Sequence, residues 1–384
     1  MPLPRRSATA AVVLEFDPVL DELRKTKQLR DGLSVAVQIG ETFWVTNDET
    51  ASVERLSCQP ARRGAPARFA DHTRFLLADY LRIPAPPEDP PDAVEADLEG
   101  IDYADGYLWL VGSHSRKRGQ AVAGKSAKKN LKKLADVDTD PNRWLLARIP
   151  VVGVAEGAPT LARTADAGRT AAQLRGTTRT NDLLQALRAD EHLAPFLAIP
   201  GKDNGFDIEG LAAVPEGRLL LGLRGPVLRG WAVVLEVAPE PRPDDPTTLR
   251  LRRLGADGRR YRKHFLVLGG LGVRDLCRDG DDVLVLAGPS MDLDGPATIF
   301  RWRGGAQAFE EAQVVSGAAL EPIIELPVGR GDDHPEGIAV YRAPTGDEPR
   351  LVVVHDAAAP TRQVGASTVR ADVVRLPARG PRAE

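Results

Sequence analysis

The chain has 384 residues, of which 42% are hydrophobic, with 36 glycines, 31 prolines and a formal net charge of −3. This charge gives the whole molecule no general attraction for nucleic acid or for an anionic membrane. Only Cys58 and Cys277 occur, without a partner at metal or redox spacing, which argues against a disulfide scaffold or a thiolate metal site. No run of eighteen apolar residues is present, so we expect a cytoplasmic protein, of bacterial source from its heavy use of Arg, Ala and Gly.

A short motif recurs along the chain and leads each time into an apolar run. In chain order, a first strand is expected at 11–16, and an acid followed by glycine then appears in DLEGI at 97–101, DIEGL at 207–211 and HPEGI at 334–338. Weaker copies lie at 33–37 and 274–277. The runs that follow the copies are rich in β-branched and aliphatic residues, as strands are. They lie at 42–48, 107–112, 218–222, 282–288 and 350–356.

Repeats of this length with strand character predict a β-propeller. Third strands are expected at 143–149, 231–237, 297–302 and 368–374, and short strands precede three motifs at 195–200, 264–269 and 323–327. The last blade lacks such a strand, and 11–16 has the pattern to supply it, which closes the ring and leaves no open sheet edge. We therefore predict an all-β, single-domain propeller over 1–384, with five blades, or six if the longest interval hides one.

Several segments carry a resemblance to a known family. They are 99–101 with 107–115, 142–149, 208–211 with 221–226, 272–276 with 287–292, and 331–338. Through them the chain resembles the bacterial family catalogued as domain of unknown function 3616, over residues from roughly 30 to the end. The resemblance implies a propeller distantly similar to the esterase-like phytases and the gluconolactonase group. These remoter relatives imply calcium-assisted hydrolysis, by analogy of fold.

The acids of the motif are the candidate metal ligands. If the motif begins the innermost strand of each blade, its acids enter the central channel at one level, where they would repel one another unless protonated or bound to a cation. Calcium is the preferred ion because it accepts many oxygen ligands in loose geometry. The opposing interpretation is structural: each acid accepts backbone N–H groups of the neighbouring blade. The predicted ligands are Glu99, Glu209, Asp275 and Glu336.

A second set of residues lies where the second strands end, on the loop-bearing face where binding residues concentrate. Metal-assisted hydrolysis of a phosphoester or lactone would then use His334, His114 or Asp48 as the base. Arg224 is a candidate clamp for an anionic substrate, with a cross-blade salt bridge to one of the acids as the alternative. The predicted substrate-binding residues are Arg224, Ser113, Ser115, Asp292 and Asp356.

Two insertions interrupt the repeat. The basic insertion at 113–142 contains a literal phosphate-loop pattern at 119–126, but no parallel βαβ context surrounds it. The insertion at 155–194 contains a short capped helix that could cover one face as a lid or pack against it. We expect a small anionic molecule or a protein as partner, no membrane, and nucleic acid only through 116–133. A non-enzymatic binding scaffold is the alternative to the hydrolase.

Overall fold

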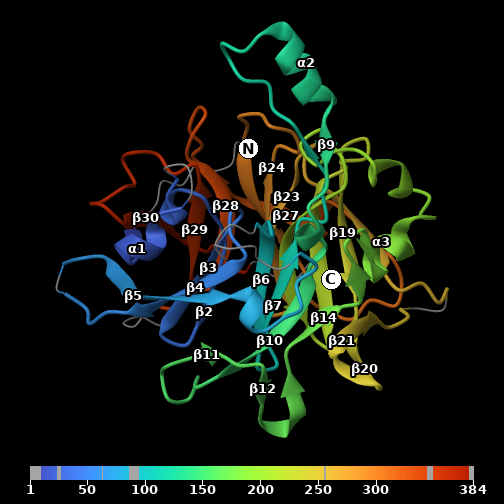
Figure 1. Cartoon of the computed structure of the whole chain (residues 1–384). Coiled ribbons are helices and arrows are strands. Elements are labelled where there is room, and N and C mark those ends of the chain that lie inside the picture. Colours follow the sequence, from blue (N-terminus) through green and yellow to red (C-terminus); the bar gives the residue numbers. More distant parts are fainter. Residues whose placement is uncertain are drawn as a thin grey trace.

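The computed structural model describes residues 10–23, 27–62, 64–85, 95–254, 257–343 and 349–379. These residues form mostly strands, arranged as sheets that stand around a common centre (Figure 1). Among them, no helix combines the length and the apolar character that crossing a membrane would need.

The strands of the described residues make up a propeller, which confirms the predicted fold class, and we assign these strands to blades 1 to 5 by the sheets in which they pair. Blade 1 holds β2 (Leu33–Ile39), β3 (Thr42–Asn47), β4 (Ser52–Cys58) and β5 (Ala67–Leu76). Blade 2 holds β6 (Leu98–Ala104), β7 (Tyr107–Gly112), β10 (Leu146–Val152) and β14 (Ala172–Leu174). Blade 3 holds β17 (Asp207–Val214), β18 (Arg218–Gly225), β19 (Trp231–Val237) and β22 (Arg262–Val267). Blade 4 holds β23 (Gly272–Asp279), β24 (Asp282–Gly288), β25 (Ala297–Trp302) and β27 (Leu320–Leu326). Blade 5 holds β28 (His334–Tyr341), β29 (Arg350–Asp356), β30 (Thr368–Arg375) and β1 (Ala10–Glu15).

The first strand of each blade lines the centre. β2 contacts β6, β6 contacts β17, β17 contacts β23, β23 contacts β28, and β28 returns to β2. Every motif copy therefore lies at the start of an inner strand, and these starts share one end of the ring, which we call the mouth.

The N-terminal strand closes the ring as predicted. β1 pairs antiparallel with β30, from Ala10 opposite Val373 to Glu15 opposite Thr368. It also pairs in parallel with β5 of blade 1, so blades 1 and 5 share one continuous sheet. The edges of both blades are thereby covered.

One expected strand was wrong. Residues 195–200 form no strand, because Pro195 lies in a 3-10 turn, η7 (Ala194–Phe196), and a proline cannot donate to a strand ladder. The fourth strand of blade 2 comes instead from within the second insertion, where β14 pairs with β10 and, in parallel, with β21 (Asp245–Leu251).

The helix of the second insertion is packed into the body. α3 (Asp182–Leu187) is capped at its N-terminus by Asn181, whose side chain accepts a hydrogen bond from Leu184 N. Leu183 and Leu187 are fully buried in a core shared with blades 2 and 3, so α3 packs there rather than covering the mouth. Around it lie β11 (Thr160–Leu161), β12 (Thr164–Ala165), η6 (Asp166–Gly168), β13 (Arg169–Thr170), β15 (Gly176–Thr177) and β16 (Thr180–Asn181).

The first insertion projects from the body. It holds β8 (Lys117–Arg118), α2 (Ala127–Ala135), β9 (Val137–Asp138) and η5 (Pro141–Trp144), with α2 standing clear of the blades (Figure 1). The remaining elements are α1 (Pro18–Asp21), η2 (Leu29–Asp31), η3 (Leu77–Asp79), β20 (Pro239–Arg242), β26 (Val314–Val315) and η8 (Gly317–Ala319).

Candidate functional site

A bulge at the start of each inner strand fixes which residues are equivalent. In the register of the first two strands of a blade, the extra residue is Glu99 in β6, Arg274 in β23 and Glu336 in β28. The irregular stretch in β17 contains Glu209, and that in β2 contains Ser34. A bulge re-aims a side chain next to functional sites in many sheets. The repeated position therefore carries three glutamates, one arginine and one serine.

The residue after the bulge governs how closely the blades approach. A Cβ on Gly100 would lie 2.7 Å from Leu211 Cβ of the next blade, and one on Gly210 would lie 2.7 Å from Asp275 Cα. Gly337 likewise lies against Ser34 and Val35. The glycine of the motif is thus required because the inner strands of adjacent blades pack backbone to backbone.

Asp275 occupies this glycine position, and not the position of the motif glutamates. Its carboxylate accepts hydrogen bonds from Leu276 N and from Ile338 N of blade 5, both at 2.7 Å. Asp102 does the same for blade 3, accepting from Ala213 N at 2.7 Å. Asp275 therefore has the structural role that was the alternative for the repeated acids. It does not stand at the position of the three glutamates with which it was grouped as a metal ligand. Sequence spacing did not show this difference because it does not reveal the bulge.

Arg274 provides a positive charge inside the ring. Its Nε lies 3.1 Å from Glu209 Oε2, and its terminal nitrogen pairs with Glu336. Glu209 is also held by Arg224, at 2.7 Å. These side chains are at most 10% exposed, so the charges interact through little water. Two of the three glutamates are thus neutralised by arginine.

Glu99 differs from its two equivalents. It is partly exposed and makes no hydrogen bond or ion pair with any residue in the described part of the chain. Burial, followed by the negative charges of Asp97, Glu209 and Glu336, raises the pKa of the Glu99 carboxyl well above its ordinary value. Glu99 is therefore the glutamate of the ring without an ion pair among the described residues, and the positive charge of Arg274 acts on it only from a distance.

Asp48 and Asp356 extend this acidic region beyond the ring. A Cβ on Gly32 would lie 3.4 Å from Asp356 Oδ1 and 3.7 Å from Asp48 Oδ1, so both oxygens border the same small space. Burial, then the charges of Asp97 and Asp356, raises the pKa of Asp48 well above its ordinary value. Asp356 Oδ1 accepts from Ala357 N at 2.7 Å. Like Glu99, Asp48 has no hydrogen bond or ion pair with another described residue.

Ser113 and Ser115 belong to a buried network beside the mouth. Arg143 pairs with Asp97 at 2.8 Å, with Glu95 at 2.6 Å, and donates to Ser115 Oγ at 3.0 Å. Ser113 Oγ lies 3.0 Å from Ser115 Oγ. Both serines are buried, so the structure places them behind the acids, as part of the support.

Arg224 is already occupied. Besides Glu209, it donates to the carbonyl oxygens of Ser290 at 3.1 Å and Met291 at 3.3 Å. The salt bridge of Arg224 to Glu209 lies within blade 3 and is not the cross-blade pair considered as its alternative role, whereas its bonds to the two carbonyl oxygens tie blade 3 to a loop of blade 4. Asp292, in this loop, is exposed and has no partner among the described residues.

The two histidines predicted as bases have different surroundings. His114 is buried, with Nδ1 2.8 Å from Gly112 O and Nε2 2.6 Å from Asn181 Nδ2. Burial lowers the pKa of His114 to about 4, so its neutral ring joins β7 to α3 and has no free nitrogen. His334 is one-third exposed, and its Nε2 lies 3.2 Å from Asp294 Oδ1. Of the two, His334 is the one that solvent can reach.

Asp207, Arg274 and Arg143 were missed in the sequence. Burial and the adjacent Glu209 raise the pKa of Asp207 to about 8. Its signal was present, because Asp97 and Asp207 stand at the same place of the motif. Arg274 directly precedes Asp275, which was predicted to be the equivalent of the motif glutamates. Only the strand register shows that Arg274 holds their position. No sequence pattern marked Arg143.

A separate acidic triad lies at the edge of blade 3. One oxygen or nitrogen each of Asp190, Glu191 and His192 lies within 4.8 Å of the others, close enough to share a cation. Lys263 Nζ fills this role, at 2.7 Å from Asp190 Oδ2, 2.9 Å from Glu191 Oε1 and 2.9 Å from His192 Nδ1. The triad fastens the second insertion to β22 through an ammonium group.

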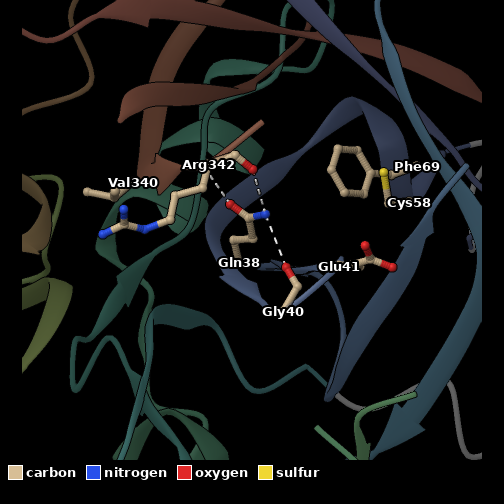
Figure 2. Close-up of a pocket in the computed structure, with 7 residues that line it drawn as sticks. All are labelled: Gln38, Gly40, Glu41, Cys58, Phe69, Val340 and Arg342. Carbon is tan, nitrogen blue, oxygen red and sulfur yellow. Dashed lines mark hydrogen bonds between the residues drawn. The ribbon is translucent and has the colours of Figure 1, made fainter. Parts of the chain in front are cut away.

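The opposite end of the ring carries a hollow of about 310 Å³ at the β2–β3 turn (Figure 2). Gln38 spans it, donating to Gly40 O and Arg342 O and accepting from Arg342 N, which links blades 1 and 5. Cys58 lines it, and burial raises the pKa of this thiol. The hollow brings no cluster of acids or histidines together, so the mouth is the candidate site.

Comparison with known proteins gives similarities of low identity. The glutaminyl cyclase of Myxococcus xanthus is 11% identical, with 96% of this chain and 98% of that one covered, at a TM-score of 0.37. The Malassezia sympodialis allergen Mala s 1 is 8% identical over 90% and 95%, at 0.39. Pseudomonas fluorescens PhoX, solved with vanadate, is 10% identical over 96% and 76%, at 0.33. These values indicate nothing about activity, and no curated protein matches the chain.

A family model does match the chain, over residues 32–372. This range includes every inner strand and all of the acids and arginines of the mouth. The chain belongs to the family described as protein of unknown function (DUF3616).

Proposed function

We propose that the mouth binds a divalent cation, calcium by preference, through Glu99 and Asp48, and uses it to hydrolyse a small phosphoester or lactone. The observation that carries the proposal is that Glu99 has no partner in a ring where Arg274 holds the two equivalent glutamates. A cation at Glu99 would remove the repulsion from its acidic neighbours.

The donors suit calcium. Carboxylate oxygens are the ligands that this ion prefers, and it tolerates irregular geometry from several chain segments. Glu99 comes from β6 and Asp48 follows β3, and Asp356, the last residue of β29, borders the same small space as Asp48. Arg143, Arg224 and Arg274 each pair with a carboxylate already. None of these three pairs includes Glu99 or Asp48.

The hydrolytic step would use the chain's own groups around the cation. The ion would polarise the phosphoryl or carbonyl oxygen of the substrate. His334, reachable by solvent and oriented by Asp294, would take the proton from the attacking water and pass it to the leaving alkoxide oxygen. His114 is left out of the reaction because both ring nitrogens are engaged in the buried support.

Calcium titration of chelator-stripped protein by calorimetry tests the cation site. Parent protein should bind calcium, and Glu99→Gln and Asp48→Asn should each weaken binding at least about tenfold, since each removes a charged oxygen ligand. Glu311→Gln is the matched control, because Glu311 is an exposed acid between β25 and β26 and belongs to no inner strand. Absence of binding by folded parent, or equal binding by Glu99→Gln, would refute the proposal.

A non-enzymatic binding role is the second candidate. It is favoured by Arg274 and Arg224, which neutralise part of the ring without any ion. The two candidates separate once calcium binding is established. Hydrolysis of phosphoesters or lactones that is lost in both Glu99→Gln and His334→Gln supports the enzyme. Calcium binding without turnover of any such substrate supports the scaffold.

A further inference from the structure

The basic insertion forms an ordered projection, which we call the arm (residues 116–138). At its base β8 pairs antiparallel with β9, Lys117 opposite Asp138 and Arg118 opposite Val137. At its tip, the Asn130 side chain accepts from Val122 N at 3.0 Å and donates to Val122 O at 3.1 Å. The arm is thus a defined structure, and α2 lies at its far end (Figure 1).

α2 separates apolar and basic side chains onto two faces. At 3.6 residues per turn, Leu131 and Leu134 share one side with Ala127. The lysines at 128, 129, 132 and 133 fall on the other. No residue of α2 is buried, and Leu131 and Leu134 are 68% and 44% exposed. Val122, beside the helix, is 50% exposed. The apolar side therefore faces solvent, and none of the described blades covers it.

The charge of the arm is strongly positive at its tip. Between 116 and 138 the basic residues outnumber the acids, which are Asp136 and Asp138. The base is neutralised in part, as Arg118 pairs with Asp203 at 2.7 Å and Lys117 with Glu95 at 3.4 Å. The lysines of the tip pair with no described acid. They are Lys125, Lys128, Lys129, Lys132 and Lys133.

We propose that the arm binds the surface of an anionic membrane. Lysines flanking an exposed apolar stripe match the way an interfacial helix places its leucines at the acyl boundary and its lysines among acidic headgroups. Nucleic acid would account for the lysines but leaves the exposed leucines without a role, and the arm has no aromatic residue for base stacking. The expectation of no membrane partner rested on the net charge of the whole chain, which conceals this local separation.

The arm begins a few residues after the end of β7, which lies at the mouth. Its base follows the buried Ser113 and Ser115, and Gly201 N donates to Arg116 O at 3.0 Å, which fixes where the arm starts. Docking would therefore hold the mouth end of the propeller close to the lipid. This placement does not depend on whether the mouth is catalytic.

Co-sedimentation of the full chain with lipid vesicles tests the proposal. Vesicles of phosphatidylcholine containing about one-third phosphatidylserine should bind the protein, and vesicles of phosphatidylcholine alone should not. Changing the four α2 lysines to Gln should weaken binding about a hundredfold or more, since each lysine near the surface contributes. The double variant Leu131→Gln, Leu134→Gln keeps the charge and the helix propensity, and should weaken binding about tenfold.

Val314→Gln is the matched control, because Val314 is as exposed as Leu131 (68%) and lies in β26, beside the outermost strand of blade 3 and outside the arm. It should bind as the parent does. If the parent fails to bind the phosphatidylserine vesicles, or if the leucine variant binds them as tightly as the parent, the proposal is wrong. A single-stranded RNA oligonucleotide that displaces the vesicles and binds parent and leucine variant equally would identify the arm as a nucleic-acid contact instead.

Discussion

Replacing Arg274 with glutamine should destabilise the fold and strengthen calcium binding in the same variant. Arg274 is the partner found for Glu336 among the described residues, whereas Glu209 keeps Arg224 at 2.7 Å. The change therefore strands one carboxylate that is 10% exposed. Removing one partner of a buried pair costs roughly 3–5 kcal/mol, and the slight exposure of Glu336 places the expected loss near 3 kcal/mol.

Calcium should offset much of this loss, because the freed Glu336 can join Glu99 as a ligand. A ligand present at about 100 times its Kd adds about 2.7 kcal/mol to the stability of the folded state. Urea unfolding, followed by tryptophan fluorescence in chelator and in calcium, measures both quantities. Arg242→Gln is the control, since Arg242 pairs with an exposed Asp244 and such surface pairs contribute only about 0–1 kcal/mol.

Two outcomes would refute this reasoning. If Arg274→Gln loses no more stability than Arg242→Gln, the ion pairs of the ring contribute little. If calcium does not raise the unfolding midpoint of Arg274→Gln more than that of the parent, the mouth is not a cation site even when its positive charge is removed.

Three further predictions concern the supporting structure. Asp275→Ala should cost about 1–3 kcal/mol in urea unfolding, because two backbone N–H groups lose their acceptor, yet leave calcium affinity unchanged; a parallel loss of affinity would contradict its structural role. Gly210→Ala should destabilise by about 1–3 kcal/mol more than Gly217→Ala, since only Gly210 abuts another blade. Burial holds the pKa of His114 at about 4, below its unfolded value, so stability should be lost as pH falls from about 6.5 towards 4. Acid unfolding should show a shallower slope in His114→Gln, and an unchanged slope would refute it.

The strand pattern predicted most of the fold, because alternating apolar runs at a fixed spacing leave few alternatives. The closing strand at 11–16 followed from the same logic, since an open edge had to be covered. The error at 195–200 has a local cause: Pro195 and Pro200 frame an apolar stretch that forms turns and is for the most part only partly buried. Composition alone could not separate such a turn from a strand.

The candidate site was predicted less completely from the sequence, because the site depends on the strand register and on how far the Arg274 side chain extends. The motif identified Glu99, Glu209 and Glu336, but a one-residue bulge decides that Arg274, and not Asp275, shares their position. The pairing of Arg274 with two glutamates depends on how far a guanidinium extends across the ring, which sequence spacing does not reveal.

Arg274 makes the distribution of charge around the ring uneven, whereas identical repeats would leave it symmetric. Two like charges about 4 Å apart repel by about 4 kcal/mol at an effective dielectric constant of 20, so a ring of glutamates needs positive charge to stay ionised. Arg274 supplies it between blades 3 and 5, next to Glu209 and Glu336. The deficit is left on the side of blades 1 and 2, where Glu99 and Asp48 lie without partners among the described residues. With an arginine at this position, we expect a cation to bind on the side of Glu99 and Asp48, and substitutions on that side should affect calcium binding most.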